Sequence, residues 1–311
     1  KIPEYWSSDT NQTWLNGHIN VKLLQNRQLN HSSGLVLLGR DIVVDFDRNK
    51  LKTSLLKSGA TIPTVDAVLL AIEQELYEGI TTKQIYKLAF SRLKKSANSH
   101  AARYNLREAL RLLGPAGFFF EKFMAKVFEN DGYQTQLNVI LQGKSVSHEI
   151  DVMLMLNEVV SSVECKFHSN VDTKSDVKIP MYIYARSLDL KDGVYDVFNG
   201  KYAISETRIV TNTRFSTDAV KFAQDYGLLL LGWDYPYGKG IKNKIDQCKL
   251  YPVTCLTTLT AMEKERLLIQ DVVLVRDLLA QTDILYKSGV HQARIKNIIK
   301  EASELCGYPF H

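Results

Sequence analysis

Two neighbouring runs of alternating residues constrain the fold more than any other feature of this chain. Residues 147–156 and 159–168 each alternate with the period of two that is typical of a β-strand. Only Asn157 and Glu158 lie between the runs, and this is the length of a two-residue hairpin loop. The sequence therefore predicts an antiparallel hairpin near the middle of the chain.

The predicted hairpin carries an acidic face. If Leu156 pairs with Val159, the register is fixed. Asp151 then lies directly opposite Glu164, and both side chains leave the same face. Like charges opposite each other destabilise a sheet, whereas a bound cation would turn that cost into attraction. Lys166 shares the face because it lies two residues beyond Glu164. Two carboxylates and a lysine around one point can hold Mg²⁺, position a water and screen the charge of a phosphate.

A helix before the hairpin carries a further carboxylate. Residues 115–131 show an apolar stripe at helical spacing, with Pro115 suited to the first turn and Gly132 to the end. Glu121 falls at the edge of this stripe, from where a carboxylate can point into the space between helix and sheet. A glutamate at such an edge is more often a solvated residue, so both interpretations of Glu121 stay open.

Ordinary explanations compete with chemistry at the hairpin. Glu149 lies opposite Lys166 in the predicted register, and such a cross-strand ion pair would contribute roughly 0.2–1 kcal/mol. That pair leaves the facing carboxylates unexplained, which favours the chemical interpretation. His148 and His168 flank the face and suit either phosphate binding, proton transfer or a structural role. Beyond the hairpin, Arg186 and two nearby tyrosines suit either the DNA backbone or a solvated helix face.

Further elements are predicted on both sides of the hairpin. Their order is helix, strand, hairpin, helix, strand, helix, strand. The predicted strand before the hairpin covers 133–142, and the elements after it are a helix over 173–190, a strand from Tyr202, a helix from Phe215 to Tyr226 and a buried strand from Leu228.

A glutamate on the first helix, followed by Asp and then Glu-x-Lys on adjacent strands, resembles the restriction-endonuclease-like nuclease core. Within that superfamily the chain is similar to Mrr-type restriction endonucleases and archaeal Holliday-junction resolvases. The resemblance covers roughly residues 114–236 and implies an α/β domain with an αβββαβαβ core and a mixed sheet. It implies Glu121, Asp151 and Glu164 as ligands of Mg²⁺ or Mn²⁺. It also implies that Lys166 orients the attacking water or stabilises the charge of the phosphorane.

The preceding region resembles the ATP-cone, a mostly helical regulatory domain that binds nucleotides. The segments that carry this likeness are 44–51, 80–85 and 102–104. The resemblance implies ATP or dATP as a regulator, with Lys50 toward the nucleotide. A helical domain that only packs or binds DNA is the alternative. The patterns predict strands around 18–24 and 35–45 and helices around 54–60, over 64–77, from Gly79 and over 101–113.

The chain is predicted to divide into four segments. They are a weakly patterned segment at 1–36, the ATP-cone-like domain at 37–113, the nuclease-like domain at 114–250 and a helical extension at 251–311. In the extension, helices are predicted over 267–279 and 292–305. The turn at 288–290 resembles a helix-hairpin-helix unit, in which backbone amides contact a phosphate; a plain packing element is the alternative.

Composition limits the partners and the cellular compartment that suit this chain. The 311 residues carry a formal net charge of +5, which permits a polyanionic partner such as DNA. No apolar run approaches the length of a membrane span, and no signal peptide is visible. The cysteines, at 165, 248, 255 and 306, show neither metal-site spacing nor disulfide density, so we expect a cytoplasmic protein.

The sequence therefore predicts a metal-dependent DNA endonuclease that acts in restriction of foreign or modified DNA. Two alternatives stay open. One is a junction-resolving or repair nuclease of the same fold, and the other is a non-catalytic, nucleotide-sensing regulator that binds DNA. Because each chain carries one predicted site, a homodimer on duplex DNA is expected.

Overall fold

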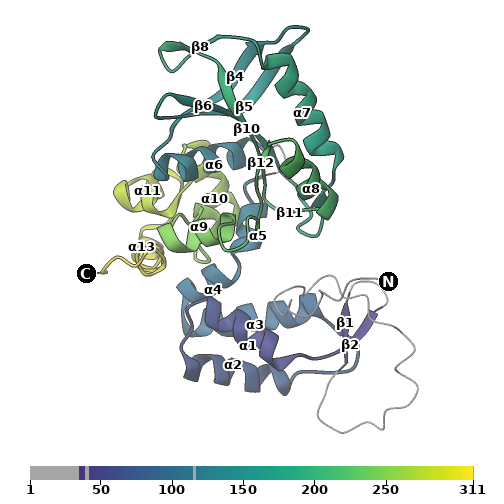
Figure 1. Ribbon diagram of the computed structural model, residues 1–311. Helices are drawn as coiled ribbons and strands as arrows, with labels where there is room; N and C mark the ends of the chain where they lie inside the picture. Colours follow the sequence, from purple (N-terminus) through teal and green to yellow (C-terminus); the bar gives the residue numbers. More distant parts are fainter. Residues whose placement is uncertain (1–34, 39–41, 115–116, 311) are drawn as a thin grey trace, which may run out of the picture. The chain divides into compact units, whose positions relative to one another are not determined.

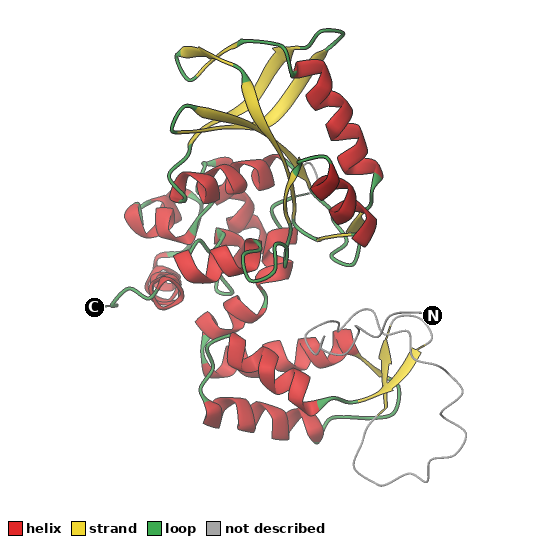
Figure 2. Cartoon of the chain, viewed as in Figure 1, coloured by secondary structure: helices red, strands yellow, loops and turns green. Residues whose placement is uncertain are grey.

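The structure is a computed structural model that describes residues 35–38, 42–114 and 117–310 of the chain (Figure 1). The predicted strand around 18–24 lies outside these residues. The chain forms two compact units that divide between Leu93 and Lys94. Both units contain helices and strands (Figure 2). The finer division into four segments stays a prediction.

The N-terminal unit combines a small sheet with helices. Asp47 caps its first helix by accepting a hydrogen bond of 3.0 Å from the amide of Lys50, so this helix begins earlier than predicted. The described strands pair in the order β2-β1-β3, with β1 antiparallel to β2 and parallel to β3. The elements are β1 (Leu35–Leu38), β2 (Ile42–Asp45), α1 (Arg48–Lys57), α2 (Ile62–Glu73), β3 (Ile80–Thr81) and α3 (Thr82–Ser96).

A mixed sheet forms the centre of the second unit. Its five described strands have the order β12-β10-β6-β5-β4, antiparallel from β4 to β6 and parallel from β6 to β12. The predicted order of helices and strands and the mixed sheet are confirmed. The elements are α6 (Phe118–Asn130), β4 (Gln134–Gln142), β5 (Ser147–Leu156), β6 (Val159–Lys166), α7 (Lys178–Leu190), β10 (Ile204–Thr211), α8 (Thr217–Asp225) and β12 (Leu229–Leu231).

Helices cover both faces of this sheet (Figure 1). The apolar stripe of α6 is buried against one face, which includes Val152 of β5 and Val163 of β6. Helices α7 and α8 pack on the opposite face, where Ile209 of β10 is buried. The predicted helix at 115–131 begins only at Phe118, because Gly117 has a left-handed φ of 81° that ends the helical backbone there.

Short elements complete the connections. Strand β7 (Lys174–Ser175) pairs in parallel with β11 (Arg214–Phe215), and β8 (Tyr195–Val197) pairs antiparallel with β9 (Gly200–Tyr202). The helix predicted over 101–113 is two helices, α4 (Asn98–Tyr104) and α5 (Leu106–Arg111). They break at Asn105, whose φ of −89° and ψ of 9° lie outside the helical range.

The C-terminal segment is helical, but one predicted helix is wrong. The predicted helix at 267–279 breaks because Asp271 has a left-handed φ of 61°, and the buried residues Val272 and Val273 lie outside any helix. The carbonyl of Val273 accepts a 2.8 Å hydrogen bond from the amide of Val253. The elements are α9 (Ile241–Cys248), the 3-10 helix η2 (Val253–Cys255), α10 (Ala261–Ile269), α11 (Val275–Ala280), α12 (Ile284–Lys287) and α13 (Gln292–Cys306).

The turn between α12 and α13 is closed by its own hydrogen bonds. The amides of Ser288, Gly289 and Val290 donate to carbonyls of the preceding helix at 2.9, 2.9 and 3.0 Å. As folded, these amides are therefore engaged within the chain rather than offered to a phosphate. In the described part of the chain, no helix is both long enough and apolar enough to cross a membrane.

Candidate active site

The hairpin has the predicted register, and its strands separate at the acidic face. Leu156 pairs with Val159, and the ladder runs as far as Val152 and Val163. It ends one position before Asp151 and Glu164 would pair. Instead, the Oδ2 atom of Asp151 accepts a 2.7 Å hydrogen bond from the backbone amide of Cys165. The carboxylate thus lies at a fork between β5 and β6.

Strand β4, which pairs with the other edge of β5, is distorted beside Asp151. The ladder between β4 and β5 passes from Leu137–Val152 to Val139–Ile150 and omits the position of Asn138. Asn138 has a left-handed φ of 52°, which asparagine tolerates better than most residues. The strand that carries Asp151 is therefore irregular on both of its edges. Irregularities of this kind re-aim side chains next to functional sites.

Glu164 points toward α7, where it meets a guanidinium. Its Oε2 atom lies 2.6 Å from Nη1 of Arg186. The pair is well shielded, since 12% of the Arg186 side chain and 21% of the Glu164 side chain are exposed. Burial, and next the charge of Asp151, raise the pKa of Glu164, whereas Arg186 opposes this rise.

Glu121, in the first turn of α6, belongs to the same acidic group. Burial, followed by the charge of Asp151, raises the pKa of Glu121 to about 7. Asn138 Nδ2 donates a long hydrogen bond of 3.4 Å to its Oε2 atom. The charges of Glu149 and Glu164 also act on Glu121. The structure thus brings Glu121, which the sequence left between two interpretations, to the carboxylates of the hairpin.

Lys166, at the end of β6, supplies positive charge to this group. Burial raises the pKa of both Asp151 and Glu164, and the charge of Lys166 opposes the rise for each. Among the described residues, no ion pair joins Lys166 to Glu149, which was the ordinary alternative. The backbone carbonyl of Glu149 instead accepts a hydrogen bond from Arg186 Nη2.

The acidic residues have the donor chemistry of a divalent cation site. Carboxylate oxygens are the ligands that Mg²⁺ and Mn²⁺ prefer. As the side chains stand, however, no three His, Cys, Asp or Glu residues converge on one point anywhere in residues 35–38, 42–114 and 117–310. Two contacts explain this: Asp151 is held by the Cys165 amide and Glu164 by Arg186. The residues fit a metal by chemistry, and Glu164 has to turn to reach it.

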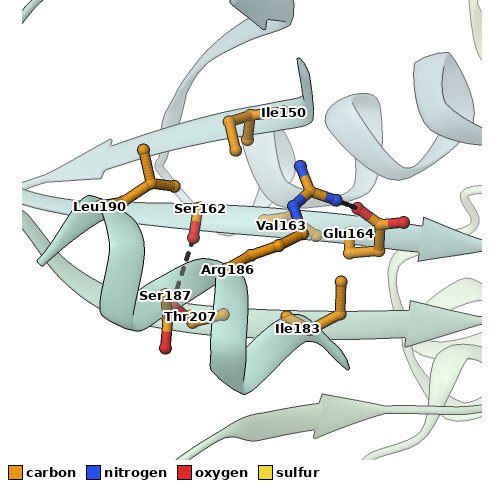
Figure 3. A pocket seen from close by; sticks show the side chains of 9 residues that line it. All are labelled: Ile150, Ser162, Val163, Glu164, Ile183, Arg186, Ser187, Leu190 and Thr207. Carbon is orange, nitrogen blue, oxygen red and sulfur yellow. Dashed lines mark hydrogen bonds and ion pairs between the residues drawn. The ribbon is translucent and has the colours of Figure 1, made fainter. Parts of the chain in front are cut away.

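A small pocket adjoins the pair between the sheet and α7 (Figure 3). Ile183, Arg186 and Leu190 line it from α7, and β6 and β10 contribute hydroxyls at Ser162 and Thr207. Arg186 was predicted to face the DNA backbone or solvent, whereas in the structure it turns to Glu164. Spacings of three and four residues place Arg186 within an apolar stripe of α7, and this was a signal that it is not solvated.

The other residues singled out from the sequence lie in ordinary contacts. His148 Nε2 is 2.9 Å from Asp189 Oδ2, and His168 Nε2 is 2.8 Å from Ser175 Oγ. Lys50 is exposed, with its Nζ atom 3.5 Å from the carboxylate of Asp47.

Comparison with known proteins shows clear relatives. Residues 251–306 match the family described as AF1548-like, C-terminal. An uncharacterised protein of Archaeoglobus fulgidus is 35% identical over 188 residues, which are 59% of this chain and 100% of that protein. The crystal structure of AF1548, a protein of unknown function, is similar with a TM-score of 0.51 and 32% identity, covering 61% of this chain and 98% of that chain.

A more distant likeness links the chain to a nuclease structure. The MspJI restriction endonuclease in complex with a 27-mer oligonucleotide is 14% identical, with a TM-score of 0.26, over 54% of this chain and 37% of that chain. A score this low carries no conclusion about this chain. By contrast, this chain covers the Archaeoglobus fulgidus protein and the AF1548 structure almost completely, at 35% and 32% identity. By this identity the chain belongs to the AF1548-like family.

Proposed function

We propose that this protein is a metal-dependent endonuclease that hydrolyses phosphodiester bonds in DNA. The observation that supports this proposal is the gathering of Glu121, Asp151, Glu164 and Lys166 at the fork between two strands. Burying mutually repelling carboxylates raises their pKa values and destabilises their charged forms. A divalent cation would convert this repulsion into binding. The order of elements around the fork is also the order that the nuclease resemblance implies.

Each residue has a distinct task in the proposed reaction. The three carboxylates would hold Mg²⁺ or Mn²⁺, which would polarise the scissile phosphate and lower the pKa of a bound water. The Cys165 amide fixes the direction of the Asp151 carboxylate, which leaves its second oxygen for a ligand. Lys166 would donate a hydrogen bond to the attacking water or to the phosphate oxygen as negative charge develops there.

The biological setting extends the proposal. We propose DNA as the substrate and restriction of foreign or modified DNA as the role, with ATP or dATP as a regulator bound at the N-terminal unit near Lys50. These assignments depend on the sequence resemblances. The junction-resolving and sensor alternatives stay predictions as well, and no contact in the described residues favours either.

Plasmid cleavage tests the proposed activity. We expect supercoiled plasmid to be nicked or linearised with Mg²⁺ or Mn²⁺ and to stay intact with EDTA. Lys166→Ala should reduce the cleavage rate by about 10²-fold or more, because a group that stabilises transition-state charge is removed. DNA binding in a gel-shift assay should persist in this variant. Lys201→Ala, at an exposed position of β9, is the matched control and should cleave like the wild type.

Two results would contradict the proposal. One is full activity of Lys166→Ala, which would remove the proposed site. The other is failure of the folded wild-type protein to cleave any plasmid, linear duplex or single strand with either metal. Cleavage that depends on millimolar ATP or dATP would support the regulatory assignment, and Lys50→Ala would then test whether the N-terminal unit carries it.

A further inference from the structure

The strongest contact inside the acidic group is made by an arginine. Arg186 Nη1 lies 2.6 Å from Glu164 Oε2 (Figure 3). Its Nη2 atom donates a hydrogen bond to the backbone carbonyl of Glu149. The Tyr182 ring packs against the guanidinium, with 5.8 Å from its Cζ atom to the ring centroid. Arg186 is therefore anchored at three points and is directed into the group of carboxylates.

This position differs from that of a surface ion pair. Exposed pairs contribute little, whereas burying charged groups costs several kcal/mol per ion unless they are well paired. Here the charge of Asp151 acts on Glu164 and the charge of Glu164 acts on Glu121, so the single positive charge of Lys166 would leave the group short of counter-charge. The guanidinium supplies that counter-charge when no metal is bound.

Arg186 and a metal ion would therefore compete for Glu164. A carboxylate can accept from several directions. However, a guanidinium and a divalent cation held within a few ångströms repel each other strongly in a shielded site. The two present contacts of Glu164 and Asp151 also keep the carboxylates from converging.

We propose that Arg186 is a built-in counter-ion that occupies Glu164 in the metal-free protein and that a divalent cation must displace. The inference rests on the proposed function and adds a regulatory step to the same site. Metal loading then exchanges one positive group for another at Glu164. The protein keeps its acidic group neutralised at low metal concentration, and it assembles the site only when the metal outcompetes the arginine.

Calorimetric titration with Mn²⁺, without DNA, tests this exchange. Arg186→Gln removes the competing charge, so its Kd for Mn²⁺ should be lower than that of the wild type by about fivefold or more, the size of ordinary coupling between two ligands. Arg208→Gln is the matched control. Arg208 forms an ion pair of the same 2.6 Å length with Glu206, and its side chain is 20% exposed. Its Kd should equal that of the wild type.

The outcomes separate the inference from the proposed function. If Arg186 only orients Glu164 for the metal, Arg186→Gln would bind Mn²⁺ more weakly, and an equal or weaker affinity overturns the inference alone. If Mn²⁺ binds no form of the protein, or binds Glu164→Gln as tightly as the wild type, the proposed metal site falls as well.

Should Arg186→Gln not fold, Arg186→Lys is informative. A lysine cannot bond Glu164 and the Glu149 carbonyl in the same forked way, so this variant should also bind Mn²⁺ more tightly than the wild type.

Discussion

At the scale of single residues, the acidic group shows how a fold can hold charges that repel each other. Glu121, Asp151 and Glu164 come from a helix and two strands, and burial raises the pKa of each. The pKa of Glu121 is raised from 4.5 to about 7, which lies in the physiological range. Such raised carboxylate pKa values are common at functional sites, and they also make stability depend on pH.

Glu121 should make the metal-free protein less stable as the pH rises. Between its ordinary pKa of 4.5 and about 7, the unfolded chain releases the proton of Glu121 while the folded protein retains it. The stability contributed by the protonated form is complete below 4.5 and is lost as the pH passes through about 7. Glu121→Gln should therefore show a shallower fall of Tm over this interval in calorimetric scans in EDTA. Glu129→Gln, on the same helix, is the control; identical slopes in wild type and Glu121→Gln would refute the prediction.

At the scale of elements, short local features decide where strands and helices turn. The hairpin loop places both Asn157 and Glu158 in left-handed backbone, with φ of 50° and 64°. Two positive φ angles are what a type I′ hairpin loop requires, and Asn-Gly suits it best. In α13, Glu301 is 1% exposed and accepts four hydrogen bonds from the amides and hydroxyls of Thr257 and Thr258. One carboxylate thereby joins the helix to a loop more than forty residues away.

Replacing the second loop residue with glycine should stabilise the hairpin. Glu158→Gly removes the steric cost of a left-handed non-glycine residue. The greater entropy of glycine in the unfolded chain offsets part of this effect. The free energy of unfolding should therefore rise by about 0.5 kcal/mol. Urea unfolding would measure the gain. Glu158→Ala loses the same side chain but keeps the strain, so it should gain nothing. Equal stabilities of the two variants would mean that the loop is not strained.

Neutralising Glu301 should weaken the C-terminal segment. Glu301→Gln keeps the shape but turns an NH₂ group toward donors, so the free energy of unfolding should fall by about 1.5–3 kcal/mol, the value of hydrogen bonds to a charged group. Chemical denaturation is the measurement, and Glu265→Gln, exposed on α10, is the control. A loss no larger than that of the control would show that the four hydrogen bonds are not needed for stability.

At the scale of the whole molecule, the proposed activity has a consequence for duplex DNA, because residues 35–38, 42–114 and 117–310 hold a single proposed site. If that site hydrolyses one strand at a time, a double-strand break would need two chains on the DNA. The described residues form two compact units, and the proposed site lies wholly in the second.

The rates of nicking and of double-strand breakage should depend differently on protein concentration. At low concentration, nicked plasmid should form first, at a rate proportional to protein. If two chains act together, doubling the protein should raise the initial rate of double-strand breakage about fourfold. Gel quantification of nicked and linear product over a dilution series provides the rates. A linear product that rises in simple proportion to protein would indicate that one chain, or a preformed dimer, makes both cuts.

Local pattern was enough to predict much of this fold. Alternation and the two-residue gap predicted the hairpin and its register, and helical spacing predicted the buried stripe of α6. These predictions succeed because they depend on neighbours along the chain. The same reasoning failed over 267–279, where a left-handed Asp271 and a hydrogen bond from Val253 override the apolar period of a helix.

The sequence by itself therefore determined that Asp151 and Glu164 lie on the neighbouring strands of one hairpin, since hairpin pairing is a local consequence of alternation and loop length. Only the tertiary structure decided that Asp151 bonds the Cys165 amide at a fork and that Arg186 of α7 turns inward to Glu164. Both contacts depend on how separate segments pack and on which charges burial forces together. The apolar spacing along α7 indicates that Arg186 is not solvated, but no pattern along one segment identifies its partner.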